Sequence, residues 1–142
     1  MDRLEDVIRE GEVADDLVLL VRGGPDTKEK ILLHADRLAD IFTFNDAPAR
    51  GLSLFAAQGD LDAWTVLGDQ LQNYPKYFRI PAASVVERFV LLATFRNPHW
   101  TLLLQTPDGS EVPEDQLIDE LVAIMGKALD NPKWVKIRKR RR

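Results

Sequence analysis

Short apolar runs alternate along the chain with apolar residues spaced three or four positions apart. The run Leu17–Val21, bounded by acidic residues and a glycine pair, is typical of a buried strand. Two later runs are separated by Arg96-Asn97-Pro98, and turn residues between β-rich runs predict an antiparallel hairpin. The predicted strands cover residues 16–24, 51–57, 76–80, 89–95 and 99–106.

Helical spacing predicts three main helices and one short one. The first main helix has an apolar stripe at Ile31, Ala35 and Leu38, and Asp26 is its expected N-cap. In the second, Trp64 falls on the apolar stripe and is expected in the core. The predicted helices cover residues 2–12, 27–42, 59–74 and 113–130, with a brief helical turn after Pro81.

This order of elements predicts a single α+β domain in which about five strands form a mixed sheet packed by three main helices. The hairpin near the C-terminal end argues against a purely parallel sheet. With 142 residues, the chain has the length of one domain and can bury roughly two-thirds of its unfolded surface. We divide it into a compact acidic domain, residues 1–132, and a basic tail, residues 133–142.

The composition of the chain excludes several kinds of functional site. The chain has no cysteine, which excludes disulfides, thiolate metal sites and cysteine nucleophiles within it. Its two histidines, His34 and His99, have no recognisable metal-ligand spacing, so no metal site is expected. The first residues are acidic, and no apolar run approaches the ~20 residues that cross a bilayer, so a cytoplasmic protein without membrane contact is expected.

Charge is distributed unevenly along the chain. The formal net charge is −4, but seven of the last ten residues are basic, and the rest of the chain holds 12 basic and 23 acidic residues. Clustered Lys and Arg attract phosphates by releasing counterions, and a tryptophan offers a face for base stacking. Alternatives are a solvated tail and a tail packed on an acidic surface of this chain or of another protein. The candidate nucleic-acid-binding residues are Lys133, Trp134, Lys136, Arg138, Lys139, Arg140, Arg141 and Arg142.

Three further residues are candidates for a small-molecule site. Arg22 ends an apolar strand, so its charge must reach solvent, face a cleft or pair with a carboxylate, and pairing is expected. Ser53 lies in a strand whose sequence, GLSLF, lacks the second glycine of a nucleophile elbow. His99 begins a strand, where a structural, half-exposed histidine is expected. If the protein is an enzyme, Arg22, Ser53 and His99 are its candidate catalytic residues.

Three segments carry a resemblance to known sequences. They are LVLLVRGGPDTKEKILLHADR at 17–37, GLSLFA at 51–56 and LLATFRNPHWTLLL at 91–104. Together they resemble a group of small, uncharacterised proteins found in actinobacteria. The resemblance implies a bacterial, cytoplasmic protein and nothing about its chemistry.

The order of Arg22-Gly23 and Ser53 along the chain is also similar to the plan of ADP-ribosyltransferases. Those enzymes place an Arg or His on an early strand and a serine-containing strand after the next helix. The similarity implies NAD as the cofactor, with Arg22 on its phosphates, and a later catalytic glutamate. No Q/E-x-E motif is present, and the nearest late acid, Glu87, falls in a predicted helical turn.

The sequence thus predicts a small binding or accessory protein. Its basic tail would contact nucleic acid or an acidic partner, and its acidic body would dock on a protein. One alternative is an NAD-using transferase or toxin-like enzyme; another is a purely structural oligomer subunit. The sequence does not decide whether the protein is an enzyme.

Overall fold

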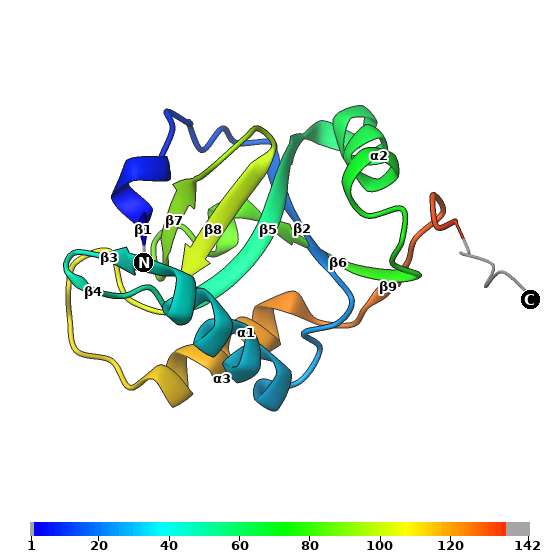
Figure 1. Cartoon of the computed structure of the whole chain (residues 1–142). Coiled ribbons are helices and arrows are strands. Elements are labelled where there is room, and N and C mark those ends of the chain that lie inside the picture. Colours follow the sequence, from blue (N-terminus) through cyan, green and yellow to red (C-terminus); the bar gives the residue numbers. More distant parts are fainter. Residues whose placement is uncertain (1, 136–142) are drawn as a thin grey trace, which may run out of the picture.

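The computed structural model describes residues 2–135 and shows one α+β domain (Figure 1). At its centre is a six-stranded sheet in which every neighbouring pair of strands is antiparallel, in the order β7-β8-β5-β2-β6-β9. The strands are β2 (Leu17–Arg22), β5 (Gly51–Gln58), β6 (Lys76–Pro81), β7 (Val90–Ala93), β8 (His99–Leu103) and β9 (Leu129–Asp130). The α+β class and the β7–β8 hairpin are confirmed, whereas the predicted mixed sheet of about five strands is wrong.

The direction of β5 explains why this sheet is not mixed. Between β2 and β5 the chain passes through α1 (Lys28–Ile41) and then through a small hairpin. This additional reversal makes β5 antiparallel to β2, where a single crossover helix would have made the two strands parallel. β5 and β6 run in the same direction, but β2 lies between them and is antiparallel to both. The two parallel strands are therefore not neighbours in the sheet.

Helices cover the two faces of the sheet unequally. Figure 1 shows α1 and α3 (Glu114–Met125) close together below the sheet and α2 (Gly59–Gln70) at the upper right, where it packs on β5 and β2. The larger core includes Leu19, Leu54, Ile80, Trp100 and Leu102 from the strands with Ile31, Ala35, Leu117 and Leu121 from α1 and α3. The smaller core, on the opposite face, includes Val18, Leu20 and Ala57 with Ala63, Val66 and Leu67 from α2. Because α2 covers only part of this second face, some side chains of the strands remain accessible to solvent there, and Ser53 is one of them.

The N-terminal segment forms part of a second sheet rather than the predicted helix over residues 2–12. The strands of this sheet, in the order β1-β3-β4, are β1 (Asp2–Arg3), β3 (Phe42–Phe44) and β4 (Ala47–Pro48). Leu4–Val7 forms a single 3-10 turn, η1, and the chain then runs extended beside β7, where Ile8 bridges Thr94. The helix prediction is wrong because these apolar residues pack between other elements instead of along one helix face.

Several helix ends differ from the predicted ones: α2, for example, ends at Gln70 rather than at residue 74. The N-cap of α1 is Thr27 rather than Asp26: the Thr27 hydroxyl accepts a hydrogen bond from the Lys30 N–H at 3.3 Å. Asp26 forms an ion pair with the Lys30 ammonium group instead. α3 ends at Met125, earlier than predicted, because Gly126 turns the chain with a φ of +65°, which glycine tolerates. The brief helical turn predicted after Pro81 is confirmed as η2 (Ala82–Ser84).

α2 buries a different stripe from the predicted one. Ala63, Val66 and Leu67 are buried, whereas Trp64 is 50% exposed. The prediction that Trp64 lies in the core is wrong, because two neighbouring stripes of this helix are apolar and the smaller side chains are the ones that face the sheet. Trp64 instead contacts Lys133, whose Nζ lies 4.6 Å from the ring centroid.

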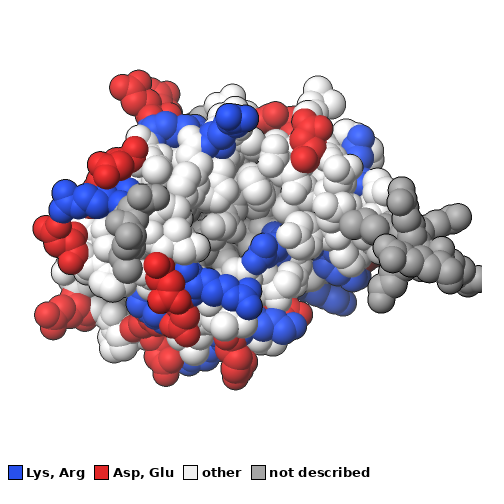
Figure 2. Space-filling view, in the orientation of Figure 1, with Lys and Arg blue, Asp and Glu red and all other residues white. Residues whose placement is uncertain are grey.

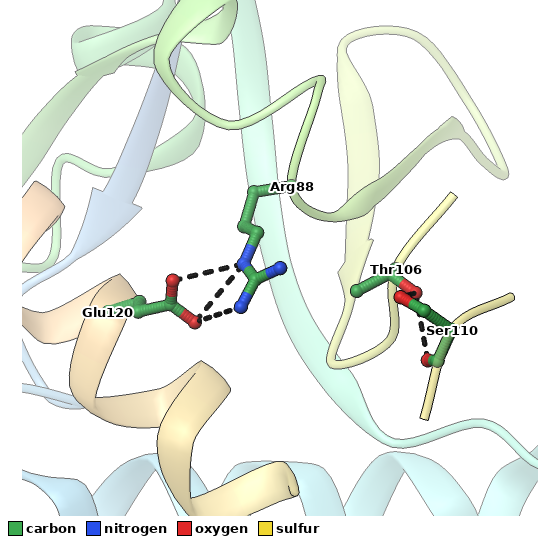
Figure 3. A network of polar contacts seen from close by, with 4 residues as sticks. All are labelled: Arg88, Thr106, Ser110 and Glu120. Carbon is green, nitrogen blue, oxygen red and sulfur yellow. Dashed lines mark hydrogen bonds and ion pairs between the residues drawn. The ribbon is translucent and has the colours of Figure 1, made fainter. Parts of the chain in front are cut away.

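An ion pair between Arg88 and Glu120 joins α3 to the turn before β7. The Arg88 guanidinium donates to both carboxylate oxygens of Glu120, through Nε at 3.0 and 3.2 Å and through Nη2 at 2.9 Å (Figure 3). This contact raises the pKa of Arg88. Close by, the hydroxyl groups of Thr106 and Ser110 lie 2.9 Å apart across the loop that follows β8 (Figure 3). The first contact joins α3 to the turn before β7, and the second closes the loop after β8.

Candidate functional site

The register of the sheet brings three candidate residues together. β8 pairs with β5 so that His99 lies opposite Phe55. In the pairing of β2 with β5, Leu20 lies opposite Phe55. If this register is continued by two residues, Arg22 lies opposite Ser53. Residues two apart on a strand share a face, so Arg22, Ser53 and His99 all lie on the face that α2 partly covers.

A cavity of about 250 Å³ opens at this place. It lies where three neighbouring strands meet the end of α2. Figure 2 shows the hollow over the middle of the sheet, with Lys and Arg side chains at its border. The lining residues are Arg22, Ser53, Phe55, Gln70, Leu71, Tyr74 and His99. All three sequence candidates for a small-molecule site therefore belong to one cavity.

Arg22 is half-buried, and its side-chain partners among the described residues are uncharged. Its Nη2 lies 3.0 Å from Nδ1 and 2.9 Å from Nε2 of His34. Its Nη1 lies 3.5 Å from the Tyr74 hydroxyl, and the guanidinium lies 5.8 Å from the centroid of the Tyr74 ring. The expected carboxylate pairing of Arg22 is wrong: within residues 2–135, no Asp or Glu forms an ion pair with it.

His34 suits this position because it is a neutral acceptor. Burial lowers the pKa of His34 below its usual value, and the nearby charges of Arg22 and Arg37 lower it further. A neutral imidazole has one unprotonated nitrogen, and this nitrogen accepts the N–H of Arg22. Arg22 is thus held in place without its charge being neutralised.

His99 is positioned by a chain of hydroxyl groups. Its Nδ1 lies 2.8 Å from Oγ1 of Thr94, which lies 2.9 Å from Oγ1 of Thr101 in a buried position. Phe55 and Phe95 both contact the imidazole edge to face, with centroid distances of 5.5 and 5.0 Å. Because Nδ1 is engaged by Thr94, Nε2 is the ring nitrogen that remains for a ligand.

The pKa of His99 lies below its usual value. Burial is the main cause; a hydrogen bond with the Thr94 backbone partly opposes it, and the charge of Arg9 adds to it. The Nη2 of Arg9 donates to the His99 carbonyl oxygen at 2.8 Å, and the Arg9 guanidinium lies 5.9 Å from the centroid of the Trp100 ring. Within the described chain, the buried Nε of Arg9 has no hydrogen-bond partner. His99 is therefore neutral near pH 7.

The cavity wall carries no carboxylate among the residues that the structure describes. Glu87, the nearest late acid in the comparison with ADP-ribosyltransferases, is exposed in the turn before β7 and does not line the cavity. Gly23, which follows Arg22, donates its N–H to the Lys76 carbonyl oxygen at 2.9 Å, so this amide is not free for a phosphate. The cavity supplies one permanent positive charge and several hydrogen-bonding groups.

The candidate nucleic-acid-binding segment is described in its first three residues. The Val135 N–H donates to the Gln72 carbonyl oxygen at 2.7 Å, and the Lys133 N–H donates to Oδ1 of Asn131 at 2.9 Å. Trp134 is 44% exposed. Residues 133–135 therefore pack on the domain beside the end of α2. The candidates Lys136, Arg138, Lys139, Arg140, Arg141 and Arg142 lie outside the described residues.

A larger cavity, of about 410 Å³, lies at the β7 edge of the sheet. Its wall includes Phe44, Phe89 and Gln105, and no lining side chain carries a charge. It therefore offers no charged group to orient a ligand. Across residues 2–135, no three His, Asp or Glu side chains gather as metal ligands would. None of the helices in this part of the chain is both long and apolar enough to cross a membrane.

Comparison of the chain with family models, with curated proteins and with solved structures finds no match. The site therefore rests on its own geometry. The sequence analysis did not identify four of the lining residues, Phe55, Gln70, Leu71 and Tyr74. Phe55 could have been found, because it lies two residues after Ser53 and shares its face. Gln70 and Tyr74 could not, because the sequence does not show that α2 ends over β5.

Proposed function

We propose that this protein binds a small anionic ligand in the cavity around Arg22. One observation carries the proposal: a half-buried arginine faces a cavity and has no carboxylate partner in residues 2–135. Removing a charge from water is unfavourable unless a counter-charge is close. His34 and Tyr74 bond the guanidinium but are neutral, and a bound anion would supply the missing charge.

The other polar groups of the wall suit an anion as well. Ser53 and Tyr74 contribute hydroxyl groups, and Gln70 contributes an amide. His99 presents a ring nitrogen, while Phe55 forms an apolar side of the cavity. A mostly apolar cavity with a few convergent polar groups is the usual form of a small-molecule site.

The test is a titration of the full chain with acetate, benzoate, inorganic phosphate, phenyl phosphate and NAD, followed by calorimetry and by thermal unfolding. We expect at least one anion to bind. Arg22→Gln should then weaken its affinity at least tenfold, about 1.4 kcal/mol, because a hydrogen bond to a charged group is worth about 1.5–3 kcal/mol. Unchanged affinity in Arg22→Gln, or no binding of any anion, contradicts the proposal.

A matched control separates the site from a general charge effect. Arg96 is exposed, lies in the β7–β8 connection and forms no side-chain hydrogen bond among the described residues. Arg96→Gln removes the same charge as Arg22→Gln, so its affinity should equal that of the unmodified chain. Equal losses in the two variants would mean that the anion responds to net charge and not to the cavity.

The NAD-using transferase remains a prediction of the resemblance. The gathering of Arg22, Ser53 and His99 in one cavity favours it, whereas the absence of a carboxylate from the described wall disfavours it. Incubation with NAD, with free nicotinamide measured by chromatography, distinguishes the two readings. Nicotinamide release that Arg22→Gln abolishes would support an enzyme; binding without release would support a binding protein.

A second candidate function is the tail-mediated contact with nucleic acid or an acidic protein. Seven basic residues in the last ten favour it, as does the exposed Trp134 beside Lys133. Since residues 133–135 pack on the domain, the informative truncation ends at Val135 and removes six basic residues. We expect labelled DNA or RNA to bind the full chain, with affinity that falls steeply with salt, and not the truncated chain. Equal binding by both would remove the tail from this function.

A further inference from the structure

Resting on the proposed function, we infer that the ligand of this cavity is a monocarboxylate carried on a flat apolar body about the size of benzoate. Three features of the site carry the inference: its single positive charge, its apolar walls and its volume. The charge and the apolar walls each exclude a class of anion, and the volume indicates the size of the ligand.

The charge of the site matches a ligand with one negative charge. Arg22 is the charged residue in the described wall, and the other polar groups are two hydroxyls, an amide and the imidazole of His99. Burial keeps this imidazole neutral near pH 7. A phosphate monoester carries about −1.5 to −2 at that pH and would leave excess negative charge in a half-buried place. A carboxylate carries one charge and leaves none.

The geometry of Arg22 also favours a carboxylate. A guanidinium is a planar fork of N–H donors, and a planar carboxylate accepts two of them side by side. The neutral acceptors His34 and Tyr74 now take up Nη2 and Nη1. A carboxylate would replace part of this contact with a charge-assisted hydrogen bond, which is shorter and stronger.

The remaining wall favours an apolar, flat body. Phe55, Leu71 and the ring of Tyr74 supply the apolar part of the cavity lining. A ligand composed of a carboxylate alone would leave these side chains against water, whereas an aromatic ring would cover them. The cavity volume of about 250 Å³ suits a small ligand with a single ring.

Calorimetry on the full chain tests the charge and the apolar walls with separate probes. Benzoate is the reference, benzamide lacks the charge, acetate lacks the ring, and phenyl phosphate and benzenesulfonate change the anionic group. We expect benzoate to bind at least tenfold more tightly than the other four. In amide NMR spectra, its shifts should centre on Arg22, Ser53 and His99. Phe55→Leu should weaken benzoate several-fold and leave acetate unchanged, whereas Arg96→Gln should change neither.

The outcomes separate this inference from the proposed function. Phenyl phosphate or benzenesulfonate binding as tightly as benzoate, with loss in Arg22→Gln, overturns the carboxylate and keeps the anion site. Acetate binding as tightly as benzoate overturns the apolar body. Benzamide binding as tightly as benzoate, or no probe binding at all, overturns both. Arg22→Lys provides the charge without the fork; it should fold and lose at least several-fold in benzoate affinity, and unchanged affinity would contradict the carboxylate geometry.

Discussion

Two arginines of this domain lie beside the same strand pair and have opposite surroundings. Arg50, just before β5, donates through Nε and Nη2 to the two carboxylate oxygens of Glu114, at 2.6 and 2.8 Å, and through Nη1 to Asp36 at 2.6 Å. Arg22, at the end of β2, contacts His34 and Tyr74 and no described carboxylate.

This difference indicates a structural role for Arg50 and a ligand-binding role for Arg22. Arg50 joins α1, β5 and α3, its charge is neutralised, and its hydrogen bonds to Glu114 and Asp36 raise its pKa. Arg88 is paired in a similar way with Glu120, which also belongs to α3 (Figure 3). The charge of each of these two arginines is thus paired with a carboxylate. Arg22 is held by uncharged groups, so its charge remains available at the cavity.

The largest effect on stability is expected at Arg50. Arg50→Gln leaves Glu114 and Asp36 without their cation and should lower the free energy of unfolding by about 1 kcal/mol, since the pair is partly exposed and screened by solvent. The melting temperature should fall by roughly 3 °C. Thermal unfolding checks this. A variant as stable as the unmodified protein would show that Arg50 is not a structural clamp.

The next effect is the response to acid. Burial lowers the folded-state pKa of both His34 and His99, so below about pH 6.5 the unfolded chain binds more protons than the folded one. Stability should therefore be full above pH 6.5 and decline as the pH falls through the lowered pKa values. Melting temperatures between pH 7.5 and 5 measure the slope, which should be shallower in His34→Gln and in His99→Gln. An equal slope in those variants would assign the acid response to other groups.

A smaller effect on stability is expected from loss of the contact between Lys133 and Trp64 on the outer face of α2. Lys133 lies over Trp64 near the surface, and exposed cation–π contacts contribute about 0.5–1 kcal/mol. Trp64→Ala should therefore destabilise the domain by about 0.5 kcal/mol in urea unfolding, far less than the loss of a buried tryptophan. A loss above about 2 kcal/mol would mean that Trp64 supports the core.

The smallest effect on stability completes the comparison. Arg22→Gln loses bonds to neutral partners but also relieves a half-buried charge, so its free energy of unfolding should stay within about 0.5 kcal/mol of the unmodified value. The same variant should show the large loss of anion affinity described above. A strong destabilisation by Arg22→Gln, measured in urea, would place Arg22 with Arg50 as a structural residue.

The strands were largely predictable because their signal is local. Five consecutive apolar residues at Leu17–Val21 need cover on both faces, and that requirement places β2 inside the sheet wherever the other strands lie. Strand direction was not predictable, because it depends on a two-residue strand, β4, that turns the chain once more before β5. The buried face of α2 was predicted wrongly for a related reason. Trp64 and Val66 lie on two neighbouring apolar stripes of the helix, and only the packing of the helix on the sheet determines which stripe is buried.

The site was predictable in its parts and not in its assembly. Arg22 and Ser53 could be singled out because a charge or a hydroxyl in an apolar strand requires an explanation. That they meet depends on the register between β2 and β5, which is set by packing over the whole sheet. The uncharged partners of Arg22 come from α1 and from the segment after α2, and no local pattern relates those elements to each other.

The short strand β9 affects how this protein can be handled. Leu129 and Asp130 pair with the outer edge of β6, and the Lys76–Asp130 ion pair lies at the same place. Exposed strand edges are templates for aggregation, and a charged, two-residue strand is a common protection. Any shortened chain used for crystallisation or for fusion should therefore keep residues through 130. Removing them would bare the β6 backbone and favour edge-to-edge association of the protein with itself.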